Sequence, residues 1–231
     1  AAAQLGGTVD GVFSEYYSFH EESVLKAPSH LTFEEAATLP TAGLTAFRVL
    51  IESGITTGQS VLVQGTGAVS FFALQIANEM GVKVFATTGN ESNEMFLKAL
   101  GAHEVINYKK IPQWQNEVNR LTHSEGVDLI IDVVGGESIG QSLQAVAMNG
   151  EIAVIGFLNS TTSTIDLVSI IRKNVRLSGF TTGSKESLFQ FVQWLEKNRI
   201  KPVIGHVTSD FISAFKAFEK RDKPGKIVVT L

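Results

Sequence analysis

Two glycines stand where an apolar run ends and a helical pattern begins, in the segment SVLVQGTGAVSFFALQIANEMG at residues 60–81. The residues before them are β-branched and apolar, and the apolar residues after them recur at helical spacing, which predicts a strand, a tight turn and a helix. Gly65 and Gly67 allow the backbone to turn sharply and a ligand to approach it closely. The helix directs unpaired N–H groups and a partial positive charge at the turn. We therefore predict an anion site here, and a pyrophosphate as its ligand.

A plain strand-to-helix turn without a ligand would also use a glycine pair, so the pair by itself is weak evidence. Dinucleotide-binding folds carry a third glycine, which lets the helix pack closely on the strand. Ser70 takes that third place in this chain. Because its hydroxymethyl group is small and can bond to a backbone carbonyl, we expect the motif to persist in altered form.

The end of the second strand distinguishes the two nicotinamide dinucleotides. An NAD site places an acid about 20 residues after the glycine turn, where it binds the ribose 2′-OH. Counting from Gly67 leads to Thr87 and Thr88, which are neutral. A carboxylate would repel a 2′-phosphate, so its absence favours NADP. NAD stays possible, since no Arg or Lys stands there and Glu91 is close by. The missing acid also argues against S-adenosylmethionine, and so against a methyltransferase.

The sequence shows no hydrolytic or metal-binding constellation. It has no cysteine, and its five histidines are scattered without the spacing of metal ligands. Ser70 lacks the G-x-S-x-G context of a nucleophile. We expect Asp132 to accept backbone hydrogen bonds or touch a ribose. Lys226 is expected to be a solvated turn residue, with a contact to the cofactor or the active cleft as the alternative. We predict no metal and name no catalytic residue.

The composition is that of an ordinary globular protein, with 231 residues of which 44% are hydrophobic. A net charge of −4 gives no electrostatic reason to expect nucleic acid or an anionic membrane as a partner. No apolar run approaches the roughly 18 residues that span a bilayer, and the first residues lack the pattern of a signal peptide. We expect a cytoplasmic protein. Because the chain begins without methionine, we also expect it to be a piece of a longer one.

Strands and helices alternate through the middle of the chain. Strands that are apolar along their whole length, such as LIIDVV and IAVIG, are typical of a parallel sheet covered by helices on both faces. The predicted fold class is therefore α/β, with a doubly wound parallel sheet. The predicted strands are 61–64, 83–88, 104–108, 128–136, 151–157 and 175–180.

The two ends of the chain fit this pattern less well. Residues 1–30 have too little apolar content to fold alone. Thr32 and Glu35 predict a capping box that starts a short helix, which Pro40 is expected to stop. The final strand, in KPGKIVVTL, has no partner in the predicted sheet, so we expect it to pair with residues 1–30 or with an absent module. Asp210 is expected to cap a helix with an apolar stripe that we assign to the core. That stripe consists of Phe211, Ala214, Phe215 and Phe218.

Eight segments resemble the medium-chain dehydrogenase/reductase superfamily, especially its zinc-independent quinone oxidoreductase-like and alcohol dehydrogenase-like branches. They are DGVFSEY, EEAATLPTAGLTAFRVL, VLVQGTGAVSFFALQIA, LKALGAHEVINY, GVDLIIDVVGG, IAVIGF, KPVIG and GKIVV. In that family a Rossmann coenzyme domain interrupts a GroES-like catalytic domain. The resemblance implies a remnant of the GroES-like domain in residues 1–30, a Rossmann dinucleotide-binding domain in 31–198 and a return to the catalytic domain in 199–231. The N-terminal bulk of the catalytic domain would be missing.

The resemblance also implies the residues of a cofactor site. The pyrophosphate would be held by Gly65, Thr66, Gly67, Ala68 and Val69, with Thr45 nearby. Thr88 would lie at the adenosine ribose, and Tyr108 matches a tyrosine that flanks the 2′-phosphate. Asn93 stands where relatives often carry a lysine for that phosphate, which weakens the case for NADP. The nicotinamide half would be lined by Gly135, Gly156, Phe157 and Leu158. Thr41 stands where zinc-binding relatives can have a cysteine ligand, which agrees with the prediction of no metal.

These inferences predict a zinc-free oxidoreductase that moves hydride between NADPH, or NADH, and a quinone, carbonyl or activated alkene as its small-molecule substrate. A non-catalytic dinucleotide-binding module, acting as a sensor or scaffold, is the alternative. Relatives commonly pair through the edge strand of the coenzyme sheet, so a homodimer is expected, with residues 152–177 as the place of contact.

Overall fold

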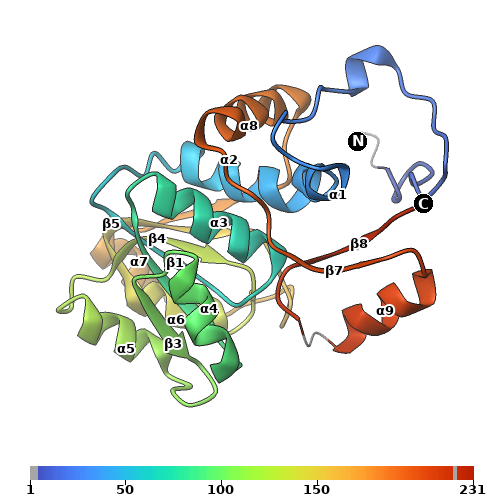
Figure 1. Cartoon of the computed structure of the whole chain (residues 1–231). Coiled ribbons are helices and arrows are strands. Elements are labelled where there is room, and N and C mark those ends of the chain that lie inside the picture. The colour runs from blue at the N-terminus through green and yellow to red at the C-terminus, as the bar shows by residue number, and fades with distance from the viewer. Residues whose placement is uncertain (1–4, 221–222) are drawn as a thin grey trace.

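The computed structural model describes residues 5–220 and 223–231. Its centre is a parallel sheet of six strands in the order β3-β2-β1-β4-β5-β6 (Figure 1). The chain builds outward from β1 to β3, crosses back to β4 and builds outward again, so the order reverses between β1 and β4. This is the doubly wound Rossmann arrangement, and the predicted fold class is confirmed. The strands are β1 (Ser60–Val63), β2 (Lys83–Thr88), β3 (Glu104–Asn107), β4 (Val127–Asp132), β5 (Val146–Val154) and β6 (Arg176–Gly179).

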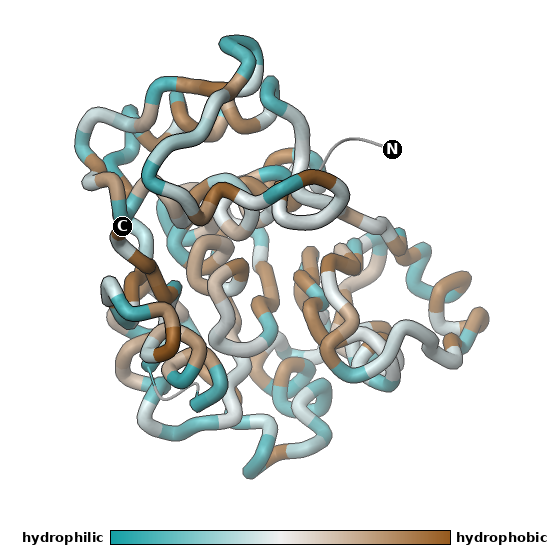
Figure 2. Tube along the Cα trace, turned by 90° about the vertical axis from the view of Figure 1, so that its right-hand side faces the viewer, coloured by the Kyte–Doolittle hydropathy of each residue, from teal (hydrophilic) through white to brown (hydrophobic). Residues whose placement is uncertain are grey.

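Helices cover both faces of this sheet (Figure 1). Successive side chains of a strand point to opposite faces, so Val61 and Val63 of β1 belong to one hydrophobic cluster and Leu62 to the other. The hydrophilic colours in Figure 2 lie mainly along the outer loops. One face carries α2 (Leu44–Glu52), α3 (Ala68–Glu79), α4 (Glu94–Ala99) and α8 (Lys185–Asn198). The other face carries α5 (Trp114–Leu121), α6 (Ser138–Ala145) and α7 (Leu167–Lys173).

Several element boundaries differ from the predictions, among them those of β5, which spans Val146–Val154 where the sequence predicted 151–157. Helix α1 (Phe33–Ala36) begins with the expected capping box, but it ends before Pro40. Pro40 instead stands at the start of a π-helical turn, η2 (Leu39–Gly43), that runs directly into α2, because a proline needs no hydrogen-bond acceptor in a first helical turn. Strand β4 ends at Asp132, so the last four residues of the predicted strand form a turn.

The C-terminal residues form a small β-α-β unit beside the main sheet (Figure 1). Strand β8 (Lys226–Val229) pairs in parallel with β7 (Ile204–Thr208), and α9 (Phe211–Lys220) connects them. The last strand therefore has a partner that the sequence did not predict, and pairing of its other edge with an absent module remains a prediction. The sequence did not reveal β7, because this short segment lacks the continuous apolar run of the central strands.

The apolar stripe of α9 is not core. Ala214 is buried, but Phe215 and Phe218 are 67% and 61% exposed, because two strands are too small a surface to cover the helix. Phe211 lies edge-on to Phe13 with 5.1 Å between the ring centroids, which places the N-terminal segment against this unit.

The N-terminal segment is also tied to the chain where it leaves α8. The hydroxyl of Ser29 donates to the Glu196 carboxylate at 2.9 Å, and the ring of His30 contacts the Ile200 carbonyl at 3.1 Å. A short 3-10 turn, η1 (Glu21–Ser23), lies in the preceding loop.

Among the residues that the structure describes, no helix combines the length and the apolarity needed to cross a membrane.

Candidate dinucleotide site

The glycine turn between β1 and α3 is open on its outer side. Gly65 has a φ of +72°, which favours glycine, and its N–H donates to the Thr87 hydroxyl at 3.0 Å. Gly67 is the N-cap of α3 and offers no side chain to cap its first turn. A Cβ added at either glycine would meet no atom within 4 Å. The turn therefore forms an open cradle under the positive end of a twelve-residue helix, which suits a diphosphate.

Ser70 occupies the place of the third glycine, and its hydroxyl makes the bond to a backbone carbonyl that we expected. It is 3% exposed, and its hydroxyl donates to the Gln64 carbonyl at 2.7 Å. This bond ties the first turn of α3 to the end of β1. Because the hydroxyl is buried and engaged with that carbonyl, it is not placed to act as a nucleophile.

Asp132 lies fully buried at the end of β4 and accepts five hydrogen bonds. The expectation that it accepts backbone hydrogen bonds is confirmed, and it acts as an organising group for the carboxyl edge of the sheet. The amide oxygen of Gln64 is left in this network without a hydrogen-bond partner. No sequence signal indicated the side-chain donors, because they come from other elements. The donors are the N–H groups of Val134 (3.0 Å) and Gly135 (2.9 Å) and the side chains of Gln64 (3.1 Å), Ser138 (3.2 Å) and Ser142 (2.7 Å).

The turns after β4 and β5 are joined to each other at the same edge. The Asn159 N–H donates to the Val134 carbonyl at 2.8 Å, and Gly135 forms a bridge with Ser160. A Cβ at Gly156 would collide with the Val133 carbonyl, so only glycine allows this approach. The predicted nicotinamide residues thus lie in one substructure. Within it, Phe157 and Leu158 are 70% and 76% exposed and leave an apolar surface at the edge.

The ends of β2 and β3 carry the predicted adenosine residues. The Tyr108 N–H donates to the Thr88 carbonyl at 3.0 Å, and the Tyr108 ring occupies the space beside Gly89 where a Cβ would lie. Thr88 is 1% exposed, and its hydroxyl bonds to the backbone of Asn90. Asn93 ends a 3-10 turn, η3 (Glu91–Asn93). The contacts predicted for these residues with a ribose and its phosphate remain predictions.

Three predicted pyrophosphate residues also lie at the glycine turn. Thr66 is in the turn itself, and Ala68 and Val69 open α3. Thr45 lies in α2, the neighbour of α3 on the same face, and its hydroxyl donates to the Thr41 carbonyl at 2.8 Å.

Comparison with known proteins identifies the family to which the chain belongs. It matches the zinc-binding dehydrogenase family over residues 68–197, more than half of its length. The chain belongs to this family. A zinc-type alcohol dehydrogenase-like protein of Schizosaccharomyces pombe is 39% identical over 210 residues, which are 88% of this chain and 61% of that protein. Human quinone oxidoreductase is 30% identical over 206 residues, 86% of this chain and 62% of the relative.

Solved structures agree with this family assignment. The crystal structure of a putative alcohol dehydrogenase from Sinorhizobium meliloti superposes with a TM-score of 0.93 at 36% identity, over 100% of this chain and 68% of that one. A mycobacterial protein complexed with NADPH superposes with a TM-score of 0.77 at 25% identity, over 89% and 68%. The resemblance to the medium-chain dehydrogenase/reductase superfamily is confirmed. The chain spans about three fifths of the length of the two curated relatives.

Lys226 differs from its prediction as a solvated turn residue. It is the first residue of β8 and is half-buried, and desolvation by this burial lowers the pKa of its ammonium group. The difference follows from the pairing of β8 with β7, which the sequence did not reveal.

Thr41, where zinc-binding relatives can have a cysteine, lies in η2. Over residues 5–220 and 223–231, no group of three or more His, Cys, Asp or Glu side chains could hold a metal ion.

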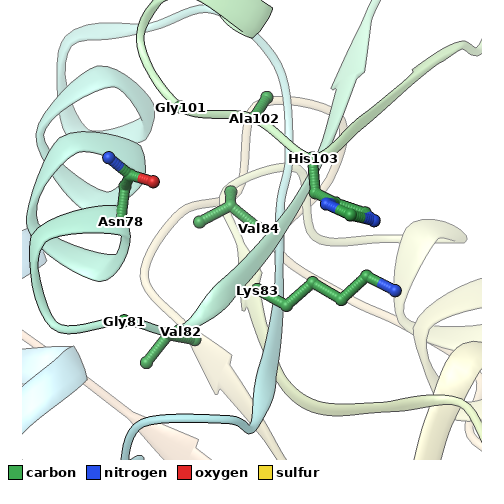
Figure 3. Close-up of a pocket in the computed structure, with 8 residues that line it drawn as sticks. All are labelled: Asn78, Gly81, Val82, Lys83, Val84, Gly101, Ala102 and His103. Atoms are coloured by element: carbon green, nitrogen blue, oxygen red, sulfur yellow. The ribbon is translucent and has the colours of Figure 1, made fainter.

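A cavity of about 480 Å³ lies at the opposite edge of the sheet (Figure 3). Its lining includes Lys83, which begins β2, and His103, which precedes β3, so it opens at the amino ends of the strands. Ligands of such sheets bind beyond the carboxyl ends. The glycine turn, not this cavity, is therefore the candidate cofactor site.

Proposed function

We propose that this chain is the coenzyme-binding part of a zinc-free oxidoreductase that moves hydride between NADPH and a quinone, carbonyl or activated alkene. The observation that carries the proposal is the open cradle at Gly65 and Gly67 beneath the N-terminus of α3. The residues present fit a dinucleotide, since a Cβ at either position would fill the space that a diphosphate needs. The alcohol dehydrogenase-like and quinone oxidoreductase relatives support the reaction class.

Each part of the carboxyl edge has a role in this proposal. The first-turn N–H groups of α3 bind the diphosphate, and the joined turns after β4 and β5 position the other half of the cofactor. Phe157 and Leu158 supply the apolar wall that excludes water from the reacting face. A bound nicotinamide supplies the hydride chemistry itself. No described side chain is assigned as a proton donor.

NADP is the cofactor we favour, because neutral Thr87 and Thr88 end β2. The mycobacterial neighbour complexed with NADPH supports a nicotinamide dinucleotide. We propose that the reaction does not require zinc. A cytoplasmic location remains a prediction.

A non-catalytic dinucleotide-binding module is the second candidate. It is favoured because no described side chain is assigned as a proton donor. The match to the Schizosaccharomyces pombe relative covers 61% of that protein. In this form the protein would bind NADPH without transferring its hydride.

One experiment separates the two candidates. NADPH binding to the chain is followed by fluorescence, and NADPH oxidation is followed by absorbance with a panel of quinones, aldehydes and enones. Binding with turnover supports the oxidoreductase, and binding without turnover on the full panel favours the module. If the chain binds neither NADPH nor NADH, both candidate functions are overturned.

A homodimer is proposed through the edge of the coenzyme sheet. Strand β6 is one of the two edge strands of the sheet, and it lies within the expected contact region, residues 152–177. Helix α7, which precedes β6, leaves Leu167 and Ile171 67% and 76% exposed. We expect Ile171→Glu to convert a dimer to a monomer, because a carboxylate would be desolvated in an apolar interface. Light scattering after size exclusion measures the mass. Ile212→Glu, at an exposed apolar residue of α9, is the matched control, and a wild-type monomer at micromolar concentration would contradict the proposal.

A further inference from the structure

An exposed ion pair joins the carboxyl ends of β2 and β3. The Lys110 ammonium lies 2.6 Å from the Glu91 carboxylate, and the two side chains are 60% and 68% exposed. Glu91 opens the η3 turn that follows β2, and Lys110 follows β3. The two residues are nineteen positions apart in the sequence, so counting along either strand alone does not reveal the pair.

The backbone on both sides of the pair is fixed by local hydrogen bonds. The Asn90 side chain accepts from the Ser92 N–H at 3.1 Å and caps η3. The Asn107 side chain accepts from the N–H groups of Lys109 and Lys110 at 3.0 and 3.3 Å. The backbone of Lys110 is therefore held in place. Its exposed side chain can change rotamer and direct the ammonium group toward another partner.

We propose that Lys110 is the residue that binds the 2′-phosphate of NADPH, and that Glu91 holds its ammonium in place when no phosphate is bound. The assignment rests on the proposed function. The end of the second strand is where the adenosine ribose lies in such folds. No lysine or arginine stands between Thr87 and Leu97, so a cation at this position must come from another strand. Lys110 is already there, beside the first residue of η3.

The relative strengths of the two contacts favour an exchange of partners. Exposed ion pairs contribute little to stability, so Glu91 releases the ammonium at small cost. A phosphate carries more charge than a carboxylate and forms strong charge-assisted hydrogen bonds. The Lys110 ammonium also offsets the charge of Glu91, which would otherwise repel the phosphate. Tyr108, packed beside Gly89, borders the same space.

Two nucleotides test the assignment without any turnover. Adenosine 2′,5′-bisphosphate and AMP differ by the 2′-phosphate alone, and calorimetry measures the affinity of each for the intact chain at low and high salt. We expect Lys110→Gln to weaken the bisphosphate about 10-fold and to leave AMP unchanged, as for the loss of one charged hydrogen bond. Glu91→Gln should strengthen the bisphosphate about 3-fold by removing the competing carboxylate. High salt should shrink both effects.

Lys109→Gln is the matched control. Lys109 is the exposed neighbour of Lys110 and has no ion pair within the described part of the chain. Bisphosphate affinity that is unchanged in Lys110→Gln, or that falls equally in Lys109→Gln, would overturn the assignment and leave the proposed function standing if NADPH still binds. A wild-type chain that binds neither nucleotide nor NADPH would overturn both.

Discussion

Gly67→Leu is expected to abolish NADPH binding while the protein remains folded. Gly67 has φ −82° and ψ 172°, which any residue adopts, and a Cβ there meets no atom within 4 Å. The side chain therefore fits the free protein, but it fills the cradle and separates a diphosphate from the N–H groups of α3. Loss of two charge-assisted hydrogen bonds, about 3 kcal/mol or more, weakens binding at least ~100-fold. Fluorescence titration measures this loss, and circular dichroism reports on the fold.

Gly140→Leu is the matched control for this variant. Gly140 lies in α6, and a Cβ there also meets no atom within 4 Å. This substitution should leave NADPH affinity within about 2-fold of wild type, since a change away from the contact costs little. Undiminished NADPH binding by Gly67→Leu would refute the cradle as the cofactor site.

Asp132→Ala is expected to lower the free energy of unfolding by about 4 kcal/mol, because it leaves several buried donors without an acceptor. Three side chains and two backbone N–H groups converge on this carboxylate. Urea denaturation followed by circular dichroism measures the change. The turn after β4 loses two of its anchors in the same variant, so the half of the site built on Gly135 should also become disordered.

Asp128→Ala serves as the comparison within the same strand. Asp128 is half-buried at the other end of β4, where it accepts from the N–H and hydroxyl of Ser60, both at 2.8 Å, and from Gln59. Its loss should cost about 1.5 kcal/mol, since water can replace part of these bonds. An equal loss of unfolding free energy in the two variants would show that the Asp132 network stabilises the fold no more than the Asp128 contacts do.

Much of the fold could be predicted from local patterns. Residues 83–88 were predicted as a strand with the bounds that the structure has for β2. Apolar runs bounded by glycines define central strands, and helical spacing defines the covering helices, because each reports the burial of one short segment. The bond from the Ser70 hydroxyl to a carbonyl could likewise be expected, since both groups lie in one turn.

Contacts between distant segments escaped the same reasoning. The sequence assigned Phe215 to the core because it has helical spacing, yet whether a stripe is covered depends on the area of the surface opposite it. The partner of β8 could not be found, because β7 has no continuous apolar run and strand pairing has no sequence code of its own. The donors to Asp132 also come from other elements, β1 and α6.

The sequence by itself determined the doubly wound sheet, the glycine turn and the edge at which we propose that a ligand binds, because these follow from the periodicity and backbone freedom of neighbouring residues. The tertiary structure alone decided which side chains meet at that edge. It placed Lys110 beside Glu91 and gathered the Asp132 network from several elements, since such meetings depend on how strands align and helices pack across the whole chain.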